Sequence, residues 1–325
     1  MWLLGICFPL WLAPVVANAE PLNVKSSAHY LNPEDIKQTE FGKLIYVSGI
    51  VLKSDNAAFG GYSGLLVSAD GQRLLAVSDK GHWLSAELIF KDGKLSGISG
   101  VEISPLLDEA GRSLVQKGNA DSESLTAERP GDLLGPVYVS FERNHRVLRY
   151  GPGKSGIYAK PELVTMPPML RNAPSNGGIE AFEWRKDGTM IALTEQWLDD
   201  AGNHIGWMIG QSGSEEIRLR TQGRFHPTDL EFLPNGDLLI LERRFTLAGG
   251  PGMQIRRVAA ATIQPGAILD GEVLINLTAK YGIDNMEGLA VRQNATGGTE
   301  LLIISDDNFS RLQKTVLLQF LLPPD

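Results

Sequence analysis

The chain has 325 residues, a net charge of −8 and one cysteine, Cys7. This acidic balance argues against nucleic acid or an anionic membrane surface as a partner, because both are negatively charged. A single thiol cannot form a disulfide within the chain, so the fold has to be held together by its apolar core.

The first 19 residues resemble a signal peptide. Residues 1–17 are uncharged and mainly apolar, and they lead into Ala17-Asn18-Ala19. An apolar stretch of this length before an Ala-x-Ala pattern is typical of export and cleavage, and a retained N-terminal anchor is the alternative. We therefore predict a periplasmic or secreted protein in which residues 20–41 are an N-terminal extension and residues 42–325 form a single domain.

One hairpin pattern recurs within that domain. Each copy has a polar residue, an apolar strand, a turn, a second apolar strand and then an acid, and the copies are about 56 residues apart. Asp70-Gly71, Asp187-Gly188 and Asn235-Gly236 mark three of the turns, since both residue types tolerate the positive φ of tight hairpins. The copies begin at Ser63, Glu123, Glu180, Thr228 and Glu287.

This repeat predicts an all-β fold, a β-propeller of four-stranded blades. After the first hairpin, residues 83–90 and 95–103 are expected to form two more strands, and a similar pair follows the fourth hairpin. Five blades account for nearly all of the chain, and six are the alternative if residues 20–62 supply more than one strand. Residues 44–52 are a spare strand that can pair with residues 316–322 and close the ring, which would remove open sheet edges.

Acidic residues recur at one end of the hairpins, where a propeller brings equivalent positions together around its channel. The second strands end in Asp79, Glu142, Glu195, Glu242 and Asp306. In one interpretation these acids accept hydrogen bonds from loop amides and tie the blades together. In the other, several of them bind a hard cation such as Ca²⁺, which takes about six to eight oxygen ligands and relieves the repulsion among carboxylates.

The second interpretation assigns roles to particular residues. The candidate metal ligands are Glu180, Asp229, Glu287 and Asp306. Guanidinium and amide groups next to the acids could hold an anionic substrate, and these candidates are Arg143, Arg146, Arg243 and Asn308. The candidate proton-transfer groups are His226 and Glu195.

Several of these segments occur together as a recognisable set: Phe59-Gly60-Gly61-Tyr62, Phe141-Glu142-Arg143-Asn144, Pro227-Thr228-Asp229-Leu230, Asp284-Asn285-Met286-Glu287-Gly288 and Ser305-Asp306-Asp307-Asn308. The set resembles the phytase-like family, labelled "esterase-like activity of phytase". The resemblance implies an exported bacterial propeller that hydrolyses a small-molecule phosphoester or ester, with Ca²⁺ neutralising phosphate and activating water. The alternatives are a non-catalytic propeller that binds a ligand or protein, and a calcium-dependent lactonase.

Overall fold

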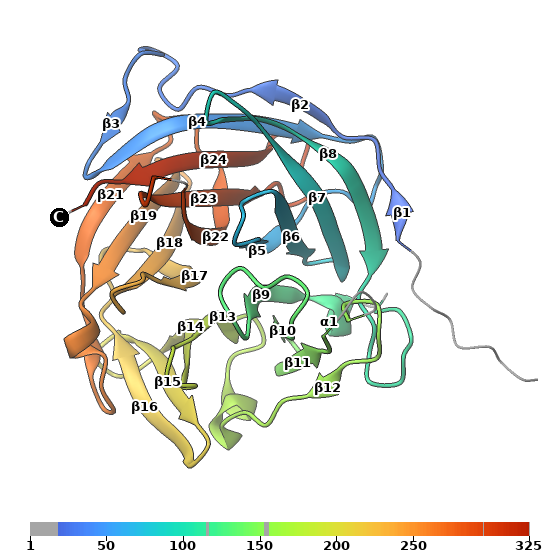
Figure 1. The fold of residues 1–325 in the computed structure, drawn as a ribbon. Coiled ribbons are helices and arrows are strands. Elements are labelled where there is room, and N and C mark those ends of the chain that lie inside the picture. Colours follow the sequence, from blue (N-terminus) through green and yellow to red (C-terminus); the bar gives the residue numbers. More distant parts are fainter. Residues whose placement is uncertain (1–18, 115–116, 153–155, 295, 325) are drawn as a thin grey trace, which may run out of the picture.

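The computed structural model describes residues 19–114, 117–152, 156–294 and 296–324. The predicted signal peptide, apart from Ala19, lies outside these residues. Within the described part, five small sheets stand in a ring around a central axis, which we call the channel, and their innermost strands meet around it (Figure 1). The chain is therefore a five-bladed β-propeller, as predicted. Among the described residues, no helix is long and apolar enough to cross a membrane.

The first two blades follow one another along the chain. The strands of the first blade, from the channel outwards, are β5 (Tyr62–Val67), β6 (Arg73–Ser78), β7 (His82–Lys91), β8 (Lys94–Pro105) and β1 (Glu20–Pro21). Those of the second are β9 (Ser122–Ala127), β10 (Val137–Phe141), β11 (Arg146–Tyr150) and β12 (Glu162–Leu163). A one-turn helix, α1 (Lys117–Ala120), connects the two blades and delivers the chain into β9.

The third and fourth blades have the same order. The third contains β13 (Ile179–Trp184), β14 (Met190–Leu198), β15 (His204–Gly210), β16 (Gly213–Leu219) and, parallel to β16, β20 (Ile268–Leu269). The fourth contains β17 (His226–Phe232), β18 (Leu238–Thr246), β19 (Gly250–Val258) and β21 (Glu272–Thr278). Two 3₁₀ turns lie in the connections, at Pro168–Asn172 and Ala260–Thr262.

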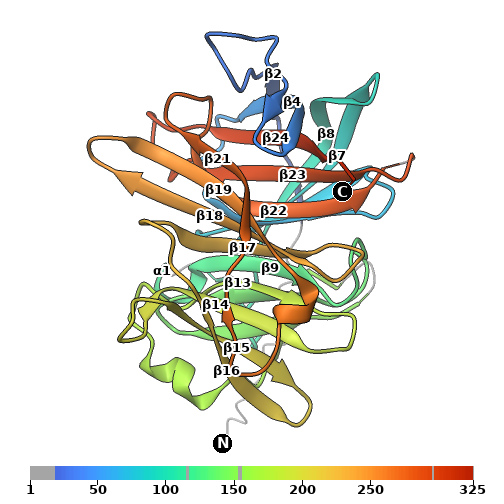
Figure 2. The same ribbon diagram turned by 90° about the vertical axis from the view of Figure 1, so that its left-hand side faces the viewer.

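The fifth blade combines strands from the N-terminal and C-terminal parts of the described chain. Its order is β22 (Asn285–Gln293), β23 (Thr299–Asp306), β24 (Thr315–Leu322), β4 (Leu44–Lys53) and β2 (Lys25–Ala28), and β3 (Glu40–Phe41) pairs with β4. The pairing of β4 with β24 confirms the predicted ring closure, and Figure 2 shows the two strands side by side. Residues 20–41, expected as an extension, supply β1, β2 and β3 to the outer edges of two blades.

Both faces of most inner strands are covered by neighbouring blades, which explains why the sequence shows apolar runs instead of alternation. In β18, for example, the run from Leu238 to Leu241 is fully buried. One apolar cluster joins the first and fifth blades through Leu65 in β5 and Leu302 in β23. The predicted turns are also confirmed, since Gly71, Gly188 and Gly236 all have positive φ.

A β-bulge lies near the start of every innermost strand. In the first blade Tyr62 pairs with Ser78 and Gly64 with Val77, so Ser63 has no partner in the ladder. The same irregularity occurs in all five blades, and the bulged residues are Ser63, Glu123, Glu180, Thr228 and Glu287. A bulge bends the strand and re-aims the extra side chain. The five polar residues that begin the sequence repeat are therefore the five bulged positions.

Candidate functional site

Carboxylates gather at the end of the channel where the innermost strands begin and the second strands end. We call this set the acid cluster, and it comprises Asp79, Asp121, Glu123, Glu142, Glu180, Glu195, Glu287, Asp306 and Asp307. Three of the bulged residues belong to it, because the second, third and fifth blades carry Glu at that position. The structure thus brings together three of the four predicted metal ligands, Glu180, Glu287 and Asp306.

The ladder register corrects one part of the predicted repeat. Glu242 pairs with Pro227, just as Ser78 pairs with Tyr62 and Ser305 with Met286. The residue equivalent to Asp306 in the fourth blade is therefore Arg243, one position later. Glu242 does not belong to the acid cluster but forms a buried ion pair with Arg256, with 2.5 Å between Oε1 and Nη2.

Within the acid cluster, Asp121, Glu123 and Glu142 form a compact triad. Each offers an oxygen, and these oxygens all lie within 4.8 Å of one another. Oxygen ligands on opposite sides of one Ca²⁺ ion are about 5 Å apart, since each Ca–O bond is about 2.3–2.6 Å long. The backbone N–H of Glu142 donates to the carbonyl of Asp121 at 2.9 Å, which fixes their separation. The triad therefore fits a calcium ion in both ligand type and spacing.

Guanidinium groups flank the acid cluster at two places. Arg143 holds the Asp121 carboxylate through Nε, and its side chain is 38 % exposed. Arg243 lies deeper and bridges two carboxylates, with 2.9 Å from Nη2 to Glu195 Oε1 and 2.6 Å from Nε to Glu287 Oε1. Of the predicted anion-binding residues, Arg143 is thus open to solvent, whereas Arg243 already neutralises part of the cluster.

Burial and mutual repulsion raise the pKa values of several carboxyl groups in the acid cluster, among them Glu123 and Glu180. Burial raises the pKa of Glu123 well above its ordinary value, and the neighbouring Glu142 and Asp121 add to this. Burial is also the main cause of the raised pKa of Glu180, and the carboxylates of Glu123 and Glu195 raise it further. Without a cation, the environment of Glu123 and Glu180 therefore favours their protonated forms, and a bound cation would displace those protons.

Comparison with known proteins agrees with the motifs. The sequence profile of the phytase-like family, described as esterase-like activity of phytase, matches residues 57–309. The chain belongs to the phytase-like family. The match begins just before β5 and ends beside Asn308, so it contains the whole acid cluster. No curated protein matches the chain.

Solved structures similar to this phytase-like chain are distant in sequence. A Bacteroides caccae protein of unknown function is 10 % identical, with 74 % of this chain and 66 % of that chain covered and a TM-score of 0.33. A putative oxidoreductase (glucose dehydrogenase) from Thermus thermophilus is 14 % identical, with 91 % and 100 % covered and a TM-score of 0.39. The Cps50 (Swd1) β-propeller domain of Myceliophteria thermophila is 12 % identical, with 95 % and 90 % covered and a TM-score of 0.36.

The fifth blade of the phytase-like propeller holds Glu287 and Asp306 together through Asn285. The Asn285 side-chain amide donates to Glu287 Oε1 at 2.7 Å and to Asp306 Oδ2 at 3.3 Å. The backbone N–H of Asn308 donates to Asp306 Oδ1 at 2.6 Å. Asn308 and Phe309 both have positive φ, and the backbone N–H of Ser310 donates to the carbonyl of Asp307 at 2.7 Å, so the loop after β23 makes a tight turn. Asn308 thus orients Asp306 through its backbone N–H, and a role of its side chain in substrate binding stays a prediction.

Asp229, the fourth predicted ligand, uses both carboxylate oxygens inside the protein. Oδ1 accepts from the backbone N–H of Leu230 at 2.9 Å, and Oδ2 accepts from that of Leu289 at 2.6 Å. The bulged residue of its strand is Thr228, so Asp229 occupies the next position and ties β17 to β22. The structure places Asp229 in an interblade contact, the structural role that the sequence left open for the acids.

Two further predicted residues are engaged with backbone carbonyls. His226 Nδ1 lies 3.2 Å from the carbonyl of Glu195, so these predicted proton-transfer residues meet through the backbone. Arg146 donates to the carbonyls of Asn144 and Asn119 at 2.9 Å and 2.5 Å and packs on the ring of Phe141. Arg146 is buried there, and the structure does not bring it to the acid cluster.

Sequence reasoning missed Asp121 and left Glu123 and Glu142 out of the ligand set. Glu123 and Glu142 could have been chosen, because both occupy repeat positions. Asp121 follows α1 in a connection that lies outside the repeat, so no periodic signal pointed to it.

We expect the metal-free protein to lose stability as the pH rises from about 6.5 to about 8. Burial raises the pKa of Glu287 to about 8, although Arg243 opposes it, and raises that of Asp306 to about 7. Unfolded carboxyl groups lose their protons near pH 4, so in this window the folded state binds more protons and stability falls with pH. Urea midpoints measured in EDTA at pH 6.5 and 8 check this, and a higher midpoint at pH 8 would contradict it.

Proposed function

We propose that this phytase-like propeller is exported and hydrolyses a small-molecule phosphoester or ester with the help of Ca²⁺. The observation that supports the proposal is the compact triad of Asp121, Glu123 and Glu142 beside the exposed guanidinium of Arg143. Asp121, Glu123 and Glu142 would hold the ion, with Glu180 next to them. A bound Ca²⁺ would polarise the substrate's phosphoryl or carbonyl oxygen and lower the pKa of a bound water.

The residues around the triad have complementary tasks in this proposal. Arg143 is exposed at the channel mouth and can donate two parallel hydrogen bonds to an anionic group. Arg243 keeps Glu195 and Glu287 paired, which limits the negative charge that an anionic substrate would meet. Glu287, whose pKa is raised to about 8, can hold a proton near neutral pH. His226 remains a second proton-transfer candidate beside Glu195.

Export is proposed on different grounds. The only cysteine, Cys7, lies in the predicted signal peptide, so the chain from Glu20 onwards contains no thiol. A thiol-free chain folds without disulfide exchange in an oxidising compartment such as the periplasm. The test is to express the full chain in a bacterial host, fractionate the cells and determine the N-terminus; an N-terminus at Glu20 is expected, and a chain retained with Met1 would contradict the proposal.

Turnover is tested with substrates of three kinds. The metal-stripped protein is assayed with p-nitrophenyl phosphate, p-nitrophenyl acetate and a γ-lactone, with and without millimolar Ca²⁺. We expect Ca²⁺-dependent hydrolysis that Glu123→Gln abolishes, because the triad loses a charged ligand. Glu215→Gln is the matched control, since Glu215 is an exposed glutamate in β16.

The possible outcomes separate the competing functions. Hydrolysis of the lactone alone would identify a lactonase. Calcium binding without turnover on any substrate would indicate a ligand-binding propeller and contradict the hydrolase proposal. Equal turnover by the wild type and Glu123→Gln would show that the triad does not take part.

A further inference from the structure

A cavity of about 990 Å³ opens at the end of the channel opposite the acid cluster. Each blade lines it with residues from the end of its innermost strand or from the hairpin turn that follows. From these segments the lining contains Val67, Ala69, Gly188 and residues 128–131, 184–186, 232–234 and 291–293. Because hairpin turns and strand starts lie at opposite ends of antiparallel strands, this cavity is separate from the proposed catalytic site.

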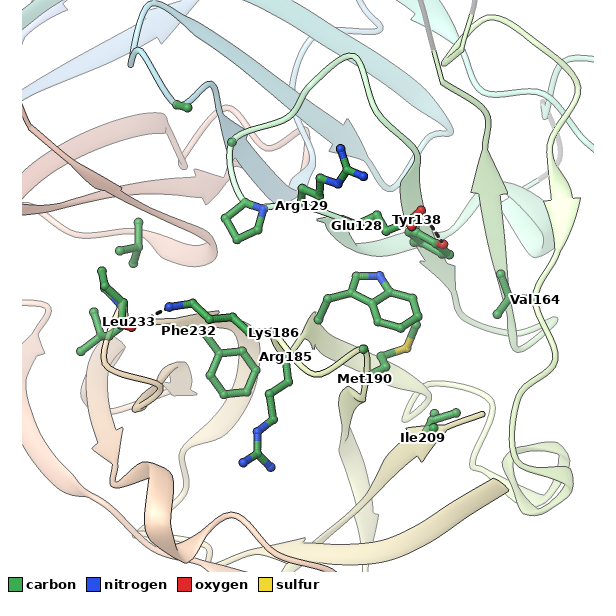
Figure 3. Close-up of a pocket in the computed structure, with 18 of the residues that line it drawn as sticks. Glu128, Arg129, Tyr138, Val164, Arg185, Lys186, Met190, Ile209, Phe232 and Leu233 are labelled. Carbon is green, nitrogen blue, oxygen red and sulfur yellow. Dashed lines mark hydrogen bonds between the residues drawn. The ribbon is translucent and has the colours of Figure 1, made fainter. Parts of the chain in front are cut away.

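The wall of the cavity is aromatic and aliphatic. Tyr138 and Trp184 meet edge to face, with 5.1 Å between their ring centroids. Met190 and Phe232 extend the same apolar surface, and Figure 3 shows both lining the pocket together with Tyr138. Such a wall favours a ligand with a flat or aliphatic apolar body, which gains free energy by leaving water.

The rim of the cavity is positively charged, although the whole chain carries a charge of −8. Among the described lining residues the cations are Arg129, Arg185, Lys186 and Arg292, and the carboxylate is Glu128. Arg185 is paired with Asp187 of the same turn, with 3.4 Å between Nε and Oδ2. Glu128 is already engaged by Arg149, 3.9 Å away, and by the hydroxyl of Tyr138 at 3.4 Å. The local field at this end of the channel therefore favours an anion.

Two of these cations retain donors for a ligand. The Arg129 side chain is exposed, and its guanidinium has no hydrogen bond or ion pair with the described residues. Lys186 donates one hydrogen bond, to the carbonyl of Pro234 at 2.7 Å, and an ammonium group has two more to give. Arg292, in contrast, is paired with Glu300 at 2.6 Å. Arg129 and Lys186 come from neighbouring blades and both border the pocket (Figure 3).

Hydrogen bonds between neighbouring blades hold the rim in place without a ligand. The backbone N–H of Ala69 donates to the carbonyl of Gly131 at 3.0 Å, which joins the turns of the first and second blades. Lys186 joins the third blade to the fourth through Pro234. A rim held by such contacts loses little conformational entropy when a ligand binds.

We propose that this cavity is a second binding site, for a small amphipathic carboxylate with an aromatic or aliphatic body. The apolar body would lie against Tyr138, Trp184 and Phe232. Its carboxylate would accept hydrogen bonds from Arg129 or from Lys186.

Binding of 2-naphthoate and of its neutral isostere 2-naphthamide, measured by calorimetry, tests the proposal. We expect the carboxylate to bind at least about tenfold more tightly, the effect of one charge-assisted hydrogen bond. The double substitution Arg129→Gln and Lys186→Gln should remove that preference. Arg224→Gln, at an exposed arginine in the loop before β17, is the matched control and should leave it unchanged.

A blocking variant locates the site. Gly210 lines the cavity, and a Cβ there would meet only Thr189 Oγ1, at 4.0 Å, so Gly210→Trp can fill the space without a clash at its base. This variant should abolish binding of both compounds. Equal affinity for the two compounds, no binding of 2-naphthoate at millimolar concentration, or unchanged binding by Gly210→Trp would each overturn the proposal.

The proposals for this cavity and for the catalytic site can be tested independently of each other. None of the three substituted residues belongs to the acid cluster, so the variants should keep any response to Ca²⁺ that the wild type shows. A loss of naphthoate binding with the calcium response retained supports two independent sites.

Discussion

Millimolar Ca²⁺ is expected to raise the melting temperature of the metal-stripped protein. A ligand that binds only the folded state at 100 times its dissociation constant adds about 2.7 kcal/mol to stability. For a chain of this length, that corresponds to a shift of about 4 °C. The shift should come with proton release, because the ion replaces protons held by buried carboxyl groups such as Glu123.

Variants of the triad should lose this calcium response. Asp121→Asn, Glu123→Gln and Glu142→Gln each replace a charged oxygen ligand by an amide of the same shape, so folding should be retained while calcium affinity falls. Glu215→Gln should respond like the wild type. Differential scanning calorimetry with and without Ca²⁺ measures the effect. If the triad variants shift as much as the wild type, the ion is held elsewhere; if the wild type does not shift, the calcium proposal is wrong.

Arg256→Met is expected to cost about 3–5 kcal/mol of folding free energy. The Arg256 side chain is fully buried, and its fork contacts Glu242 twice, from Nε to Oε2 at 2.6 Å and from Nη2 to Oε1 at 2.5 Å. Gln254 donates a third hydrogen bond to the same carboxylate at 2.8 Å. Removing the guanidinium leaves Glu242 buried without its counter-charge, which is more costly than removing the pair as a whole.

Two further variants separate this explanation from a loss of packing. The double substitution Glu242→Leu and Arg256→Met should recover much of the stability, because no uncompensated charge remains. Arg220→Met breaks an ion pair with Asp270 that is 54 % and 45 % exposed, and it should cost less than about 1 kcal/mol. Urea unfolding measures all three. Equal losses for Arg256→Met and Arg220→Met would contradict the argument.

The sequence predicts the framework well because the framework repeats. The apolar runs, the Asp-Gly and Asn-Gly turns and the spare strand before Lys53 each arise from local chemistry, and the structure confirms all three. The direction of single side chains is harder to predict, because it depends on the register at the bulges. A one-residue difference there separates Arg243, which pairs with carboxylates of the acid cluster, from Glu242, which lies in a separate buried ion pair.

Partners in three dimensions explain the other differences. Asp229 matches the acidic pattern of the repeat, yet Leu289 from the next blade supplies the N–H that engages it. Asp121 lies outside the pattern, yet the connection after α1 brings it to Glu123 and Glu142. The partners of Asp229 and Asp121 both depend on contacts between segments that are far apart in the sequence, and a local sequence pattern does not predict such contacts.

The side chains at the five bulged positions can vary without disturbing the strand pairing that builds the ring. A residue outside the hydrogen-bonded ladder has no cross-strand neighbour to match, so its side chain can be exchanged with little effect on the blade. Three residue types occupy this position in the five blades: serine at Ser63, threonine at Thr228, and glutamate in the other three. Related propellers could therefore acquire a different ion or substrate by changing a few of these five residues, while inheriting the same scaffold unaltered.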